Sequence, residues 1–150
     1  TIMENIILFD EGINEDVVIN SAKEIGIHDF IMSLPGGYNY VVGERGITLS
    51  TGQRQLISFL RVYLRNPKIL ILDEATSSID SHTEEILQTA LKKLFEGRTT
   101  IVIAHRLSTI INSDKILLLE NGKVLEEGTH SELLKKGGKY SEMYITQISD

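Results

Sequence analysis

Two acidic residues that directly follow a short apolar run could support catalysis in this chain. The run Ile69–Leu72 is continuously apolar, which is typical of a strand buried on both faces. Asp73 is therefore expected at the carboxyl end of a strand, where open α/β sheets bind ligands, and its carboxylate suits Mg²⁺. Glu74 follows and could act as a general base on a water molecule. A solvated acidic turn would give the same pattern, so these residues alone leave both interpretations open.

A second candidate is the segment Leu-Ser-Thr-Gly-Gln at positions 49–53, where a helix is predicted to begin. Ser50 is expected to be the N-cap, and Gly52 would let a ligand approach the backbone closely. The unpaired N–H groups and the positive dipole end of a helix start favour a phosphate. For this segment alone, an ordinary capped helix is the simpler interpretation.

A third candidate is His105, which follows the apolar run Ile101–Ala104. If that run is a second buried strand, His105 lies at the same sheet edge as Asp73, where it could hydrogen-bond a phosphate or orient a water molecule. An isolated histidine is more often structural or at the surface. The other histidines are assigned no function.

The strands that would position these residues are predicted from apolar runs. The first three are interpreted as buried on both faces. The Asn121-Gly122 pair between the last two is typical of a two-residue antiparallel hairpin. The predicted strands are Ile69–Leu72, Ile101–Ala104, Ile116–Leu119 and Lys123–Leu125.

Helical patterns separate these runs, which indicates an α/β fold with a mainly parallel sheet. Ser81 and Glu84 are expected to form a capping box at one helix start, and Thr129 and Glu132 at another. The helix that begins at Ser81 is expected to bury Ile86, Leu87, Ala90, Leu91 and Leu94. The predicted helices are Glu15–Ile25, Thr51–Asn66, Ser81 to Gly97, and one from Thr129.

Composition narrows the function classes. The chain has 150 residues and 41% hydrophobic residues, which suits a globular domain. Its formal charge of -6 argues against nucleic-acid binding over the whole surface but leaves a local basic patch open. The absence of cysteine excludes disulfides, thiolate zinc sites and a cysteine nucleophile. No apolar run is long enough to span a bilayer. The chain begins at Thr1, so it is expected to be a piece of a longer protein.

The combination and order of these features resemble the nucleotide-binding domain of ATP-binding cassette (ABC) transporters. The resemblance covers essentially the whole chain and implies a P-loop NTPase-like α/β core plus a helical subdomain that carries the signature motif. Two further segments, at 34–46 and 120–134, resemble the exporter branch. The matching motifs are the signature-like LSTGQRQ (49–55), the Walker B-like ILILDE (69–74), the D-loop-like SSID (77–80) and the switch histidine in IAHRLSTI (103–110).

The resemblance implies a catalytic role for three residues. In this family two domains face each other head to tail and hold ATP between them. By resemblance, Asp73 would help to hold Mg²⁺, Glu74 would polarise the attacking water, and His105 would contact the γ-phosphate. The implied reaction is in-line attack of water on the γ-phosphoryl group.

The resemblance also implies that the signature residues bind ATP held by the opposite domain, and that Asp80 crosses the dimer interface. Thr51 stands where the family usually has glycine, and a positive φ there would be penalised. Threonine at this position could mark one half of a heterodimeric exporter. The implied ATP-binding residues are Ser50, Thr51, Gly52, Gln53 and Asp80.

The phosphate-binding motif G-x-x-x-x-G-K-[ST] does not occur in the 150 residues. The chain is therefore expected to be a partial nucleotide-binding domain, without the Walker A and Q-loop region. About 1–66 would form the helical subdomain and about 67–150 the C-terminal part of the ATPase core. Alone, it is expected not to hydrolyse ATP.

The implied function is that of the ATP-hydrolysing part of a membrane exporter, with ATP and Mg²⁺ bound. The implied partners are a second nucleotide-binding domain and transmembrane domains, with no nucleic acid, at the cytoplasmic face of the cell membrane. A soluble DNA-repair or chromosome-maintenance ATPase is one alternative, and a non-catalytic interaction fragment is another. VVGERG (41–46), expected near the contacts with the transmembrane part, and AHRLSTI (104–110) favour the exporter.

Overall fold

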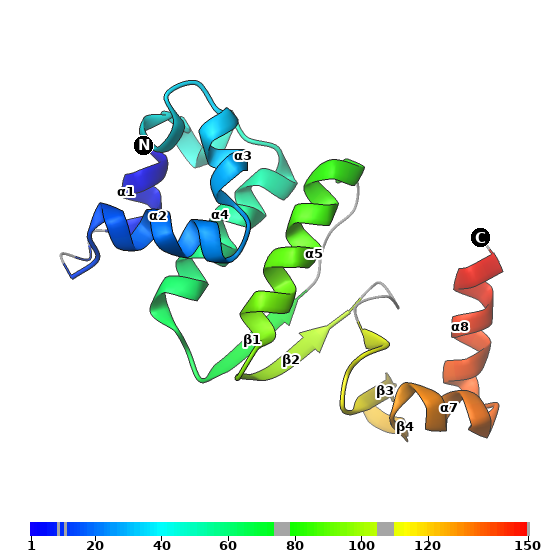
Figure 1. The fold of residues 1–150 in the computed structure, drawn as a ribbon. Coiled ribbons are helices and arrows are strands. Elements are labelled where there is room, and N and C mark those ends of the chain that lie inside the picture. The colour runs from blue at the N-terminus through cyan, green and yellow to red at the C-terminus, as the bar shows by residue number, and fades with distance from the viewer. Residues whose placement is uncertain (9, 11, 74–78, 105–109, 150) are drawn as a thin grey trace. The chain divides into compact units, whose positions relative to one another are not determined.

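The computed structural model describes residues 1–8, 10, 12–73, 79–104 and 110–149. The contacts divide the chain into two compact units. The first contains Thr1–Ile71 and Thr76–Ile101, and the second contains Leu72–Ala75 and Val102–Asp150. Figure 1 shows the order of helices and strands along the chain.

The first unit is helical and is built around α4. The buried face of α4 carries Leu56, Phe59 and Leu60, as the i, i+3, i+4 spacing in the sequence predicts. Helices α1 and α2 contact α4, as does α5 (Figure 1). The elements of this unit are α1 (Ile2–Ile7), α2 (Glu15–Glu24), α3 (His28–Ser33), the 3-10 helices η1 (Gly37–Asn39) and η2 (Glu44–Gly46), α4 (Thr51–Arg65) and α5 (Ser81–Phe95).

The predicted bounds of α2 and α4 are confirmed to within one residue. At the end of α4, Asn66 takes a left-handed conformation just before Pro67, which cannot continue a helix. The short helices α1 and α3 were not predicted, because six residues are too few to show a clear helical periodicity.

The predicted cap of α5 is wrong. Its N-cap is Asp80, whose carboxylate accepts a hydrogen bond from the Thr83 N–H at 2.9 Å, in place of the predicted box of Ser81 and Glu84. Aspartate is as good an N-cap as serine, and it lies one residue earlier. Ile86, predicted to be buried, is only partly buried.

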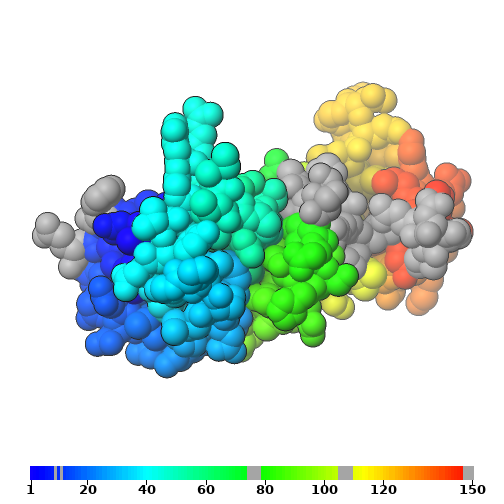
Figure 2. Space-filling model, turned by 90° about the horizontal axis from the view of Figure 1, so that it is seen from above, coloured from blue at the N-terminus to red at the C-terminus, as the bar shows by residue number. Residues whose placement is uncertain are grey.

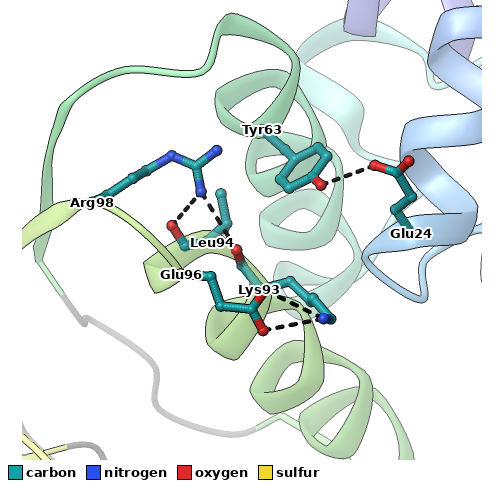
Figure 3. A network of polar contacts seen from close by, with 6 residues as sticks. All are labelled: Glu24, Tyr63, Lys93, Leu94, Glu96 and Arg98. Atoms are coloured by element: carbon teal, nitrogen blue, oxygen red, sulfur yellow. Dashed lines mark hydrogen bonds and ion pairs between the residues drawn. The ribbon is translucent and has the colours of Figure 1, made fainter.

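The far ends of α4 and α5 are joined by a polar network (Figure 3). Arg98 donates to the Leu94 carbonyl at 2.6 Å and to Asn66 Oδ1 at 2.8 Å, and its guanidinium carbon lies 5.5 Å from the centre of the Tyr63 ring. Tyr63 in turn donates to Glu24 on α2 at 2.9 Å. The network therefore ties the end of α4 to both α2 and α5.

Strands β1 (Ile69–Asp73) and β2 (Thr99–Ile103) are neighbours in a two-stranded sheet. The predicted burial of these strands on both faces is wrong. Ile69 and Ile71 are 63% and 66% exposed, and Ile101 and Ile103 are each 53% exposed. A continuous apolar run suits a strand that is covered on both sides, but the described residues leave these alternate side chains open to solvent.

The second unit contains a β-hairpin. Strands β3 (Ile116–Glu120) and β4 (Lys123–Gly128) pair antiparallel, with an irregularity between Leu118 and Leu119. Asn121 and Gly122 both have positive φ, as the favoured two-residue hairpin turn requires. The predicted hairpin is confirmed.

After the hairpin the chain forms α7 (His130–Lys136) and α8 (Lys139–Ser149). The predicted capping box of Thr129 and Glu132 is confirmed at the start of α7. Ile116, Leu133 and Tyr140 form the buried cluster of this unit. Among all the described residues, no helix is both long and apolar enough to cross a membrane.

Candidate functional site

The start of α4 is a fully formed capping box. The Gln53 N–H donates to Ser50 Oγ at 3.2 Å, and the Ser50 N–H donates to Gln53 Oε1 at 3.0 Å. These reciprocal bonds fix the backbone from 50 to 53. In the described part of the chain, the N–H groups of Thr51 and Gly52 have no acceptor, so both are available to an anion.

Thr51 is accommodated without backbone strain. It is the first residue of α4, and the described non-glycine residues with positive φ lie elsewhere in the chain. The penalty considered for threonine at this position therefore does not arise. Its hydroxyl instead accepts a hydrogen bond from Arg54 Nη2 at 3.0 Å.

Arg54 connects the start of α4 to the preceding loop. Its Nη1 donates to the Leu49 carbonyl at 2.6 Å and lies 3.5 Å from the Gly46 carbonyl oxygen. Gly46 has a φ of +68°, which favours glycine, and a Cβ there would lie 3.2 Å from Arg54 Cδ, so the Arg54 side chain would have to shift slightly. The segment that contains η2 projects from the surface in cyan in Figure 2.

A cavity of about 310 Å³ lies beside this loop. It is bounded by α1, by the loop and by one face of α4, and Arg45, Arg54 and Arg61 line it. Arg61 is held in place by Asn5, whose backbone carbonyl accepts from Arg61 Nε at 2.6 Å. In the same loop, but outside the lining of the cavity, Val41 and Ile47 are 68% and 81% exposed.

Gly52 is buried against the start of α5. A Cβ at this position would lie 2.7 Å from Thr83 Cγ2 and 2.9 Å from Ile79 Cγ2. The sequence suggested that glycine is needed here so that a ligand can approach, but the packing between α4 and α5 already requires it. The Thr83 N–H also donates to the carboxylate of the N-cap Asp80, and hydrogen bonding to Thr83 lowers the pKa of that carboxyl.

Of the three predicted catalytic and metal-binding residues, the structure describes one. Asp73 ends β1 with an exposed side chain, as predicted for the carboxyl end of a strand. Glu74 and His105 lie outside the described residues, so their placement relative to Asp73 is not described. Within the described ranges, no group of three or more histidine or acidic side chains is arranged to hold a metal ion.

Sequence reasoning missed Arg54 and Thr83 at this site. A signal for Thr83 was present, because it extends the buried stripe of Leu87, Ala90, Leu91 and Leu94 by one helical turn. Because threonine is polar, it is not counted in an apolar helical pattern. Arg54 gave no comparable signal, because two of its partners are backbone carbonyls, which no sequence pattern marks.

The family model described as ABC transporter matches residues 2–77, which include the capping box, Asp73 and Glu74. The chain belongs to the ABC transporter family. It is 51% identical over 147 residues to proteins of Staphylococcus aureus strains NCTC 8325 and COL that are named multidrug export ATP-binding/permease proteins. These matches cover 98% of this chain and 25% of each relative, so the chain spans about a quarter of their length.

A solved structure of a bacterial Atm1-family ABC exporter with ATP bound is also similar to this ABC transporter chain. It is 44% identical, with a TM-score of 0.84, over 98% of this chain and 26% of that one. The α/β fold class predicted from the sequence is thereby confirmed, and the small sheets match part of the exporter's fold.

Proposed function

We propose that this chain is part of the ATP-hydrolysing domain of a membrane exporter. The observation that carries the proposal is the capped start of α4, where two backbone N–H groups beside the Ser50 hydroxyl have no acceptor among the described residues. A helix start of this kind binds the oxygens of a phosphate group well. The exporter names of the relatives and of the similar structure support the same assignment.

In this proposal Ser50, Thr51, Gly52 and Gln53 bind the terminal phosphate of ATP that a second nucleotide-binding domain holds. Because Gln53 and Ser50 hold each other, the N–H groups are fixed before ATP arrives. Binding then costs little reorganisation, which is how a preorganised site stabilises developing negative charge. Asp80, exposed at the start of α5, reaches across the interface.

Hydrolysis is assigned to residues near the ends of β1 and β2. Asp73 supplies an exposed carboxylate, the type of oxygen ligand that Mg²⁺ prefers. When bound there, Mg²⁺ would supply charge neutralisation on the phosphates. Glu74 orients and deprotonates the attacking water, and His105 contacts the γ-phosphate.

We further propose that the loop beside the cavity contacts transmembrane domains at the cytoplasmic side of the cell membrane. Its exposed Val41 and Ile47 offer apolar contacts, and Arg45 offers a charged one. Arg54 joins this loop to the ATP-binding start of α4, which gives a direct route from nucleotide to the membrane part.

The test is Mg²⁺-dependent ATP hydrolysis by the full-length protein in proteoliposomes. The Glu74→Gln variant is expected to lose at least 100-fold in kcat, because general-base catalysis contributes roughly that much. The matched control is Glu127→Gln, an exposed glutamate paired with Lys115 on the surface, which should hydrolyse ATP at the wild-type rate. Equal activity of Glu74→Gln and wild type would refute the assignment. The 150-residue chain alone is expected to show no turnover.

A further inference from the structure

Thr83 touches both halves of the proposed site. It is 7% exposed, and its methyl group occupies the space next to Gly52 that any larger residue at 52 would need. Its backbone N–H donates to Asp80 Oδ1 at 2.9 Å. One buried residue thus lies between the start of α4 and the aspartate that caps α5.

The surrounding structure makes this contact stiff. The ends of α4 and α5 are joined through Arg98, which donates to the Asn66 side chain and lies over the Tyr63 ring. Figure 3 shows its bond to the Leu94 carbonyl on α5. The two helices are therefore fixed to each other near both ends, at Gly52 and Thr83 and again at Arg98. A shift of the α4 start must then move the α5 start with it, because packed elements transmit displacement.

We propose that Thr83 is a positioning residue that holds Asp80 at a fixed place relative to Gly52, so that ATP contact and the reach of Asp80 across the interface change together. This inference rests on the proposed function. Thr83 itself does not contact ATP in this scheme, because it is buried between the two helices.

The test uses two small substitutions in the full-length protein. Thr83→Ser removes the methyl contact with Gly52 and keeps the backbone N–H that bonds Asp80. Thr83→Val keeps both the methyl group and the N–H. Thr83→Ser is expected to lower kcat for ATP about 3- to 10-fold while KM changes less than about 2-fold, whereas Thr83→Val should change both constants less than about 2-fold. The matched control is Thr89→Val, an exposed threonine on the same helix, which should leave both constants unchanged.

A double-mutant cycle separates positioning from simple destabilisation. In an Asp80→Ala background, Thr83→Ser should cause no further loss of kcat, because its effect acts through the position of Asp80. Losses that multiply independently would overturn the proposal. Equal kcat for wild type and both Thr83 variants would overturn it as well.

A measurement without ATP keeps the inference separate from the proposed function. Gly52→Ala should lower the melting temperature, and Thr83→Ser in that background should recover part of the loss by removing one clashing methyl group, whereas Thr89→Ser should recover none. If Gly52→Ala does not fold, the single serine variants replace it, and Thr83→Ser should lower the melting temperature more than Thr89→Ser does. Recovery with both serine variants in the Gly52→Ala background, or equal melting temperatures of the two single variants, would refute the contact. If the wild type hydrolyses no ATP while these results hold, the proposed function fails and the link between Gly52 and Asp80 stands.

Discussion

Gly138, which precedes α8, lies directly against the carboxyl group of Glu126, and replacing it with alanine should break a buried hydrogen bond. A Cβ at this position would overlap Glu126 Oε1 and lie 2.9 Å from Glu126 Cδ. Glu126 is 7% exposed, and its Oε2 accepts the Tyr140 N–H at 3.1 Å. The backbone of Gly138 is not itself in a strained region, so the conflict is with the Glu126 side chain alone.

The expected cost follows from the groups involved. Displacing the carboxylate leaves the buried Tyr140 N–H without its charged acceptor, which costs about 1.5–3 kcal/mol. Alanine also lowers the conformational entropy of the unfolded chain, which stabilises the folded state by about 0.4–1 kcal/mol. The net loss is about 1–2 kcal/mol, or roughly a 5- to 30-fold increase in local opening at the start of α8.

Amide hydrogen exchange at Tyr140 measures this opening directly, because its N–H is the donor that loses its partner. Gly137→Ala is the matched control. Gly137 has a φ of +63° with no atom within 4 Å of the added Cβ, so alanine there strains the backbone but leaves Glu126 in place. Equally fast exchange of Tyr140 in both variants would refute the reasoning. The reasoning would also be refuted if Gly138→Ala lowered stability as much in a Glu126→Ala background, where the clash is absent, as it does in the wild type.

Other outcomes follow from the residues around the α4 start and from one buried tyrosine. Thr51→Gly should lower the free energy of unfolding by about 1 kcal/mol in urea titrations, because Thr51 is helical and bonds Arg54; a gain would contradict this. Asp80→Ala should melt below the wild type at neutral pH. Because hydrogen bonds from Thr83 hold the pKa of Asp80 below its ordinary 3.8, that stabilisation is lost as the pH falls through the folded value, and the two melting curves should converge in acid. Burial raises the pKa of Tyr38 to about 12, so ultraviolet titration should show its phenol ionising last among the tyrosines. The stabilisation that the buried neutral phenol contributes should be lost as the pH rises from 10.0 through 12. Ionisation near 10.0 in the folded chain would exclude this.

Local features of this chain could be predicted from the sequence because they depend on residues a few positions apart. Ser50 and Gln53 are separated by one helical turn, and Asn121-Gly122 selects its own turn type, so the cap and the hairpin follow from short-range chemistry. The choice between Asp80 and Ser81 as the cap of α5 could not be made, because both are good N-caps at adjacent positions.

Features that depend on packing could not be predicted. From the sequence, Gly52 was interpreted as a residue that lets a ligand approach the backbone. The structure shows that glycine is needed for packing against Ile79 and Thr83, which are distant in the sequence. The candidate catalytic residues Glu74 and His105 remain predictions from motif resemblance. Asp73 was placed correctly because a strand end is a local property of the apolar run before it.

The stability of β1 and β2 depends on whatever covers their exposed isoleucine side chains. Each side chain that passes from water into a packed layer contributes on the order of 1 kcal/mol or more, given that Ile69 and Ile71 are about two-thirds exposed. Any covering layer that binds only the folded form adds its binding free energy to folding. A melting temperature measured on these 150 residues is therefore a lower bound for the same residues with that face covered.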